Sequence, residues 1–474
     1  MKKINLIVLL FIGLVFVSCD KDFEELNTNP NNPTSIPSQL LLGNIIRNTG
    51  NIMYSTFNGG DMGECWAQHW AKVQYNDEAR YEPRESSLTN VWTGLYEQVA
   101  ADANQMYILA GEEGSLVNQG VAQTMKAYSM LLLTDLYGNV PFSEALQGAV
   151  NIAPVYDSQA TVYNGCLALL DEAMVLLNPA NGDLDSSQDI IYGGDVSKWR
   201  KFAASLKFRA LMRMSAKDLR AGEMLALVNS GMLFSSSDDE AKLVYLSAAP
   251  NANPIYETVV FGTRGEWKVN SEIVDRMSGS NDNRLPVVAQ VNDNDEYRGK
   301  PSGIADVPSN EYSYANVSPL GEFYLAPELP AVFLSYTELQ FLLAEAAKKG
   351  YINGGDTAAS SYYQAGIASS FADNDGASMG GYYSGAVVYT SGNALEQIAT
   401  QKWLGLYGQG MEAWTEWRRT GYPMLTPAED GAINEIPSRY RYPVIEQSLN
   451  AANYSDAANA MGGDNLTSPV WWMN

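Results

Sequence analysis

Aromatic side chains gather with amides and arginines in two stretches of this chain, residues 65–92 and 267–324. The face of a Trp or Tyr ring can stack on the C–H patches of a sugar ring, while Asn, Gln, Asp and Arg hydrogen-bond its hydroxyls. We predict that the two stretches converge on one binding site for a neutral, hydroxylated ligand. The residues predicted to contact that ligand are Trp66, Trp70, Tyr75, Arg80, Tyr81, Trp267, Tyr297 and Tyr312.

Some of these aromatics could equally belong to the hydrophobic core. Trp66, Trp70 and Trp92 lie in segments with helical patterns, where large apolar side chains commonly pack inward. His69 lies between Trp66 and Trp70 and could be a partly buried helical residue or a polar contact in an aromatic pocket. Both interpretations stay open from the residues alone.

Residue patterns for catalysis or metal binding are missing from the sequence. The single histidine excludes a zinc site with several His ligands. We find no P-loop, dinucleotide-binding fingerprint or GxSxG elbow. With 54 acidic residues, no particular pair of carboxylates can be chosen for a glycosidase. We therefore predict no catalytic residues, no metal, no cofactor and no enzymatic activity.

One short segment, residues 373–376 (DNDG), resembles the start of a calcium-binding loop. The twelfth position of such a loop would be Ser384, where an EF-hand has a bidentate glutamate. We predict a turn instead. Residues 292–296 are acidic enough to hold a calcium ion by accident, but we predict no metal site there.

The net charge of −24 and the pI of about 4.4 argue against nucleic acid and against electrostatic adhesion to anionic lipid. The apolar content of 46% is ample for a large core. Cys65 and Cys166 could form a disulfide, but no pattern brings them together, and we expect two separate thiols.

The N-terminus has the pattern of a lipoprotein signal peptide, residues 1–19. Lys2 and Lys3 precede an apolar run at 4–17 that is too short to span a bilayer comfortably. Ser18 and Cys19 then resemble a lipobox, with Phe16 where Leu is common. Lipidation of Cys19 by acyl chains such as palmitate would anchor the protein. A plain signal peptide cleaved elsewhere is the alternative.

Residues 20–37 are predicted to be a flexible tether, because they combine acidic residues with Asn-Pro pairs and lack apolar periodicity.

From residue 38 to 474 we predict one mainly α-helical domain. Helical patterns occur at 39–57, 88–110, 117–137, 161–177, 197–215, 335–349 and 357–371. Thr161 is predicted to cap its helix. In the 197–215 helix, Lys201, Arg209 and Arg213 supply charge.

A tryptophan-rich helical hairpin is predicted over residues 398–423, divided at Gly408 and Gly410. Its Trp residues could line a groove or form the seam between two packed helices, and the seam is favoured. Glu412, Arg418 and Arg419 are expected to pair as charged neighbours or to cap this seam.

Residues 233–329 are predicted to be a long irregular, loop-rich insertion that faces the ligand. This region is rich in Gly, Pro, Asn and Tyr, and such long loops in compact domains are commonly functional. Short strand-like pieces are predicted at 242–246 and 257–261.

Six motifs resemble the SusD/RagB outer-membrane lipoproteins, in the SusD-like branch, and occur in that family's order. They are DLYGNVPFSEA (135–145), KWRKFAASLKFRALMRMS (198–215), NDNRLP (281–286), FLSYTELQFLLAEA (333–346), EAWTEWRRTGYP (412–423) and IPSRYRYPVIEQSLN (436–450). The resemblance implies a tetratricopeptide-like helical-repeat scaffold, which periodicity alone does not show. It also implies ligand contacts from an N-terminal segment and from loops.

The same resemblance implies a surface-facing lipoprotein of the outer membrane that binds oligosaccharide. Such a protein would deliver this nutrient, as a hinged lid, to a SusC-like TonB-dependent transporter. Acidic residues after Cys19 are similar to the family's surface-export signal. Two alternatives remain: a surface glycoside hydrolase, and a helical-repeat scaffold that binds peptides.

Overall fold

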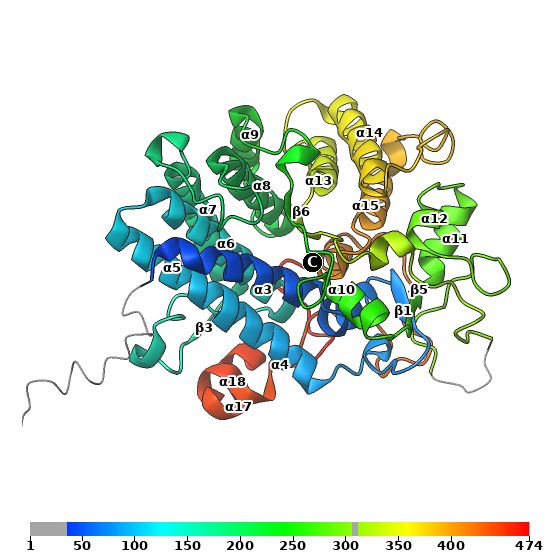
Figure 1. The fold of residues 1–474 in the computed structure, drawn as a ribbon, viewed down its shortest axis with the longest axis horizontal. Coiled ribbons are helices and arrows are strands. Elements are labelled where there is room, and N and C mark those ends of the chain that lie inside the picture. The colour runs from blue at the N-terminus through cyan, green and yellow to red at the C-terminus, as the bar shows by residue number, and fades with distance from the viewer. Residues whose placement is uncertain (1–35, 306–310, 474) are drawn as a thin grey trace, which may run out of the picture. The chain divides into compact units, whose positions relative to one another are not determined.

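The computed structural model describes residues 36–305 and 311–473. Met1–Pro37 and Ser38–Asn474 are two separate units, and only the second is described below (Figure 1). The predicted signal peptide, Cys19 and all but the last residues of the predicted tether lie outside the described residues.

The second unit is built mainly of helices. Those before the loop-rich region are α3 (Leu42–Tyr54), α4 (Glu85–Thr93), α5 (Ala101–Glu113), α6 (Leu116–Tyr137), α7 (Gln159–Leu176), α8 (Val196–Met214) and α9 (Ala221–Ser230). Those within and after it are α10 (Pro254–Tyr256), α11 (Ser271–Gly279), α12 (Leu285–Val288), α13 (Tyr336–Lys348), α14 (Gly355–Asp373), α15 (Ala394–Gly405), α16 (Gly410–Thr420), α17 (Val444–Leu449) and α18 (Ala451–Ala460).

Consecutive helices pack side by side in a curved row. Helix α5 contacts α6, α6 contacts α7 and α7 contacts α8, and the row continues from α8 to α13 and α14 (Figure 1). Because each helix buries one stripe against its neighbour, stacking pairs in this way builds a continuous core. The predicted mainly α, tetratricopeptide-like scaffold is confirmed.

Strands are few and short, and they form three two-stranded antiparallel sheets. These pair β1 (Trp70–Lys72) with β5 (Trp267–Val269), β2 (Val140–Pro141) with β3 (Tyr156–Asp157), and β4 (Ala241–Leu243) with β6 (Ala331–Leu334). The strand predicted at 242–246 is therefore present in part, as β4.

The strand predicted at 257–261 is wrong, because Glu257–Phe261 forms η8, a turn of π-helix that continues α10. Asn253 begins this helical segment, and its side chain accepts a hydrogen bond from the backbone N–H of Ile255 at 2.8 Å. A five-residue run is too short for its apolar pattern to separate a strand from a helical turn.

The predicted cap of α7 is also wrong. The helix begins at Gln159, and Ser158 is the N-cap, whose hydroxyl accepts a hydrogen bond from the backbone N–H of Thr161 at 3.2 Å. Ser and Thr are both good caps, and here the earlier of the two occupies the position with extended backbone.

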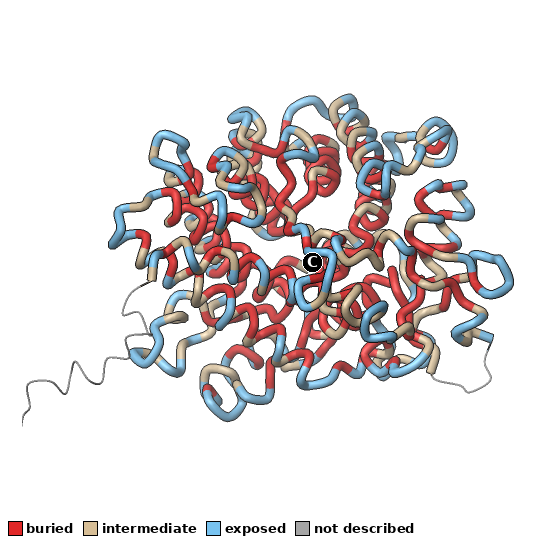
Figure 2. The backbone as a smooth tube through the Cα atoms, in the orientation of Figure 1, coloured by how far each residue is buried: buried red, intermediate tan, exposed pale blue. Residues whose placement is uncertain are grey.

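The tryptophan-rich hairpin consists of α15 and α16. Its tryptophans pack into the core, as the favoured interpretation predicts. Trp403 and Trp414 are buried, while Trp417 is partly buried against the core. The tube in Figure 2 shows buried backbone running through the centre of the helical row, with exposed segments at the turns.

Buried ion pairs join α8 to three other helices. Arg209 contacts Glu338 of α13 at 2.6 Å. Arg213 contacts Asp135 of α6 at 2.6 Å and Glu416 of α16 at 2.8 Å. The two arginines that supply charge to this helix thus lie inside the molecule, because several carboxylates converge on them.

The charged residues of the hairpin pair as expected. Glu412 contacts Arg213, and Arg419 contacts Glu345 and Glu416. Arg418 instead donates hydrogen bonds to two backbone carbonyl oxygens, those of Asp135 and Ser438, each at 2.8 Å.

The backbone of α16 lies directly against η2 (Thr56–Glu64), a π-helical turn that precedes β1. A Cβ atom placed on Gly410 would lie 2.2 Å from the backbone nitrogen of Glu64, and one on Gly63 would lie 2.6 Å from the backbone of Gly410. Only glycine permits this approach, which fixes η2 and hence the start of β1 on the scaffold.

Cys65 and Cys166 are buried and unpaired with each other, as expected. Burial raises the pKa of both thiols. His69 is fully buried and its Nδ1 lies 2.9 Å from Glu64 Oε2. Within 36–305 and 311–473, no helix has both the length and the apolar character needed to cross a membrane.

Candidate functional site

The two aromatic-rich stretches converge, as predicted, through the pairing of β1 with β5. Trp70 lies opposite Val269, and Lys72 lies opposite Trp267. Beyond the strands, the backbone N–H of Val73 donates to the carbonyl of Glu266 at 2.9 Å. Residues far apart in the chain therefore share one small sheet, and the loop that follows β1 emerges beside the loop that precedes β5.

Four of the predicted ligand-contacting residues lie inside the protein. Trp66, Trp70 and Trp267 are at most 1% exposed, and Tyr81 is 3% exposed. The indole of Trp66 donates to the carbonyl of Glu78 at 2.8 Å and packs edge-on against Trp414. Protein atoms cover these rings, so they do not offer a face to a ligand.

The burial of Trp267 has a specific cause. Its indole N–H donates to Asp61 Oδ1 at 2.8 Å, and Lys72 Nζ lies 5.0 Å from the ring centre. Lys72 also contacts Asp61 at 2.9 Å. Asp61 Oδ2 accepts a further hydrogen bond from Arg84 at 3.0 Å. The polar side-chain atoms of Trp267, Lys72 and Asp61 therefore all have partners, which is the condition for burying them.

The exposed tyrosines are linked to this buried group through Arg264, whose guanidinium lies 5.6 Å from the ring centres of both Tyr75 and Trp267. Tyr75 is 59% exposed, Tyr314 is 46% exposed and Tyr297 is 37% exposed. Tyr312 is partly exposed. We call Tyr75, Tyr297, Tyr312 and Tyr314 the tyrosine face. It is connected across the two stretches, because Tyr314 donates a hydrogen bond to Gln74 Oε1 at 3.1 Å.

Cationic side chains lie against the rings of the tyrosine face. The Arg264 guanidinium is 5.6 Å from the ring centre of Tyr75, and Lys268 Nζ is 5.4 Å from that of Tyr314. The Arg298 guanidinium is 5.0 Å from the ring of Tyr312. Burial lowers the pKa of Lys268. These cation–π contacts hold the rings in place and leave hydrogen-bond donors beside them.

Arg80 lies apart from these rings. Its Nε donates to the carbonyl of Asp430 at 2.9 Å, and its guanidinium lies 3.8 Å from Asp77 and 3.7 Å from Glu82. Its contacts therefore hold the 428–432 segment to the turn that contains Tyr81, whose hydroxyl accepts from the backbone N–H of Ala428 at 2.8 Å.

Five residues of the site are not among those predicted to contact the ligand: Gln74, Arg264, Lys268, Arg298 and Tyr314. Tyr314 could have been found, because it lies two residues after Tyr312 in the same loop. Arg264 and Lys268 carry no local signal, since only tertiary pairing brings them beside tyrosines from other segments. The pairing of β1 with β5 does so for Arg264, and the bridge between Lys268 and Pro319 does so for Lys268.

The side chains of the tyrosine face are of the kinds that bind a polar ligand. Among the residues that the structure describes, no three His, Cys, Asp or Glu side chains form a group that could hold a metal ion. Residues 374–376 form the predicted turn after α14. The side chain of Asn292 accepts from the backbone N–H groups of Asn294 and Glu296, so the acidic 292–296 segment is likewise a turn.

A family model described as "Starch-binding associating with outer membrane", of the SusD-like type, matches residues 30–443. No curated protein is detectably similar to this chain. Among solved structures, 71 chains match. One is a chitin-binding protein, 26% identical with a TM-score of 0.82, over 92% of this chain and 100% of that one.

Two further structures agree. A SusD homologue from Bacteroides fragilis is 26% identical, with a TM-score of 0.77, and the match covers 93% of this chain and 100% of the other. A chitin-binding SusD homologue from Flavobacterium johnsoniae is 23% identical, with a TM-score of 0.81 over 92% and 98% of the two chains. At that identity, the last comparison shows the shared fold.

Proposed function

Since the chain belongs to the SusD-like family of starch-binding proteins that associate with the outer membrane, we propose that it is a cell-surface lipoprotein that binds oligosaccharide at the tyrosine face. Anchored through Cys19, it hands this nutrient to a SusC-like TonB-dependent transporter. The family membership supports the outer-membrane association and the transporter. No covalent chemistry is required of the chain.

The observation that carries the proposal is the exposure of tyrosine rings from two distant segments beside fixed cations. Ring faces of this kind match the C–H patches of a pyranose, and the neighbouring Gln74, Arg264 and Arg298 can hydrogen-bond its hydroxyls. Because Arg264, Lys268 and Arg298 already lie against three of the rings, little conformational freedom is lost when a ligand binds.

Chitin oligosaccharides are the first ligands to test, since a chitin-binding protein is among the structures that resemble this chain. We would titrate the full chain, purified in detergent, with a panel of oligosaccharides by isothermal calorimetry. Saturable heat with one glycan class is the expected result.

Variants then place the site. Tyr75→Ala and Tyr314→Ala should each weaken binding about tenfold, because each removes a stacking ring. Tyr351→Ala, a partly buried tyrosine at the end of α13, is the matched control and should bind as the unaltered chain does. Full affinity in both face variants would contradict the assignment of the tyrosine face.

The two alternative functions would give different results in the calorimetric titration. Heat that continues steadily after every injection would mean turnover, and the glycoside hydrolase would replace the binding protein as the proposal. Saturable binding of peptides with none of glycans would select the peptide-binding scaffold.

A further inference from the structure

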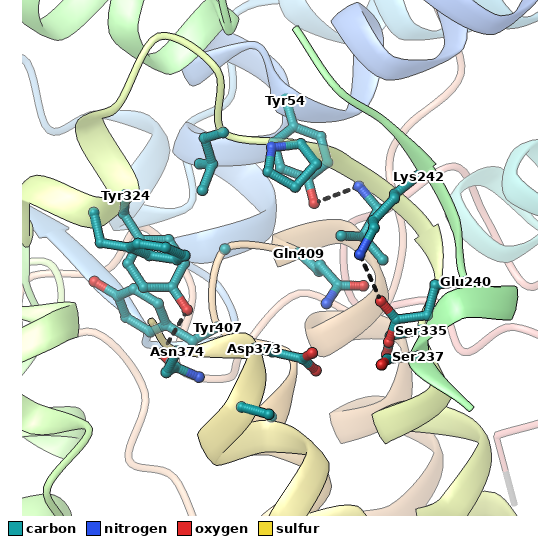
Figure 3. Close-up of a pocket in the computed structure, with 17 residues that line it drawn as sticks. Tyr54, Ser237, Glu240, Lys242, Tyr324, Ser335, Asp373, Asn374, Tyr407 and Gln409 are labelled. Carbon is teal, nitrogen blue, oxygen red and sulfur yellow. Dashed lines mark hydrogen bonds and ion pairs between the residues drawn. The ribbon is translucent and has the colours of Figure 1, made fainter. Parts of the chain in front are cut away.

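A separate cavity of about 360 Å³ opens between the scaffold and the loop-rich region (Figure 3). Its walls come from β4, the segment 329–332, the 3-10 turn η9 (Glu322–Leu325), the end of α14 and the turn after α15. Its volume is at the lower end of the roughly 300–1,000 Å³ that small-molecule sites occupy. No member of the tyrosine face lines it.

One wall of the cavity is aromatic. Tyr324 and Tyr407 are buried and meet edge to face, with ring centres 4.7 Å apart. Their hydroxyls are engaged elsewhere, since Tyr324 donates to Asn374 Oδ1 at 2.8 Å and Tyr407 donates to the carbonyl of Val288 at 3.1 Å. The cavity therefore meets mainly the carbon surface of these rings, as the left side of Figure 3 shows.

The opposite wall is charged. Glu240, Lys242 and Asp373 are the charged residues among those that line the cavity. Lys242 Nζ lies 3.3 Å from Glu240 Oε2, and Asp373 Oδ2 accepts a hydrogen bond from Thr337 at 2.6 Å. Two carboxylates thus face one ammonium group, so the cavity has a surplus negative charge when both acids are ionised.

The pKa of Glu240 agrees with a surplus of negative charge in the cavity. Burial and, next, the negative charge of Asp373 raise the pKa of Glu240 to about 7, although Lys242 acts in the opposite direction. An additional positive charge in the cavity would favour ionised Glu240.

Hydrogen-bonding groups complete the cavity. The side chain of Gln409 lies at its centre in Figure 3, between the aromatic and the charged walls. Ser237 lies at the rim beside Glu240. A ring that carries hydroxyls could stack on Tyr324 or Tyr407 and reach these polar groups at its edge.

We propose that this cavity is a second ligand site, which binds the protonated amine of a small hydroxylated ring compound, namely an amino sugar. The ammonium group lies between Asp373 and Glu240, and the sugar ring lies against Tyr324 and Tyr407. This site is independent of oligosaccharide binding at the tyrosine face.

The test is calorimetric titration of the full chain in detergent at pH 7 with glucosamine, N-acetylglucosamine and glucose. Glucosamine should bind at least about tenfold more tightly than the two neutral sugars, because only it carries the charge that the carboxylates attract. Equal affinities for the three sugars, or no saturable heat with glucosamine, would overturn the proposal.

Two substitutions test whether the amine of glucosamine binds between Asp373 and Glu240. Asp373→Asn keeps the acceptor for Thr337 but removes the charge, and it should weaken glucosamine binding about tenfold. Glu240→Gln should do the same. The matched control is Asp375→Asn, an exposed residue of the adjacent turn whose positive φ of 54° suits asparagine. Unchanged binding in folded Asp373→Asn and Glu240→Gln proteins would assign glucosamine to another place.

The two sites can be separated in the same experiment. Tyr75→Ala should leave glucosamine binding unaltered, and Asp373→Asn should leave oligosaccharide binding unaltered. Loss of glucosamine binding in Tyr75→Ala would show that the amine binds at the tyrosine face and not in the cavity.

Discussion

Trp267 shows how a residue can belong to a binding region and still serve stability. It is 1% exposed, and its indole is hydrogen-bonded to Asp61. Replacing it by alanine removes a large buried side chain and leaves a cavity. It also takes one hydrogen-bond donor from Asp61, which keeps its contacts with Lys72 and Arg84.

We expect Trp267→Ala to lower the free energy of unfolding by about 3–5 kcal/mol, measured by urea denaturation. Tyr75→Ala, which removes a 59% exposed ring, should change it by less than about 1 kcal/mol. If Trp267→Ala unfolded at the same urea concentration as the unaltered chain, its structural role would be refuted.

Glu345 provides a test of acid stability. Burial alone would raise the pKa of this carboxyl group, but Arg419 and Lys349 outweigh it and lower the pKa to about 2. Because the folded pKa lies below the unfolded value of about 4.3, Glu345 stabilises the fold above pH 5 and loses this contribution as the pH falls towards 2.

Glu345→Gln should therefore reduce the free energy of unfolding by on the order of 3 kcal/mol at pH 7, and by progressively less below about pH 4. Denaturation at a series of pH values measures this difference. Glu396→Gln, at an exposed position of α15, is the control and should change stability by less than about 0.5 kcal/mol. A loss for Glu345→Gln that did not depend on pH would rule out the ion pair as its cause.

The sequence predicts which kinds of residue form the site, but not which individual side chains reach the surface. The aromatic-rich stretches were identified because composition reveals them, and Tyr75, Tyr297 and Tyr312 do reach the surface. Trp66 and Trp267 could not be separated from them, because sequence does not show that Trp66 meets Trp414, or that Trp267 meets Asp61, from remote segments.

At the scale of elements, the contact between η2 and α16 leaves no room for a side chain at the glycines where the two backbones meet. Gly410→Ala would place a Cβ 2.2 Å from the backbone nitrogen of Glu64, and neither helical segment can move alone. We expect a loss of several kcal/mol, on the order of that caused by overpacking a core, with a lower melting temperature in calorimetry.

The matched control is Gly222→Ala in α9, where an added Cβ has no neighbour within 4 Å. That substitution should stabilise the protein by about 0.5–1 kcal/mol, since alanine favours helix over glycine. Equal melting temperatures for the two variants would show that the segments at Gly410 can separate without loss.

Long helices with full apolar stripes were predictable, since α6, α8 and α13 repeat their apolar residues over several turns. Short elements were not. Residues 257–261 could form either a strand or a helical turn, and the tertiary packing around α10 decides between them. The pairing of β1 with β5 joins segments far apart in the chain, and three-residue strands carry no signal for their partner.

For the whole molecule, the proposal predicts attachment through lipid. The Cys19→Ala protein should appear in the soluble fraction after cell breakage, while the unaltered protein should sediment with outer membranes, because an acylated cysteine supplies the anchor. Fractionation and immunoblotting measure the distribution. Sedimentation of both proteins with membranes would show that another feature holds the chain there.

Attachment alone does not place the protein outside the cell. Protease added to intact cells should digest the unaltered protein if it faces the medium. If the protein were digested only after the cells had been broken, a surface-facing position would be contradicted.

The two buried thiols can be used to detect transient unfolding of the segments around them. Cys65 lies beside Trp66 at the end of η2, in the segment that leads to β1, and Cys166 lies within α7 of the scaffold. A thiol reagent can reach either sulfur only when the surrounding segment unfolds transiently. The ratio of the two labelling rates would therefore reveal whether an oligosaccharide tightens the binding region alone or the entire helical row.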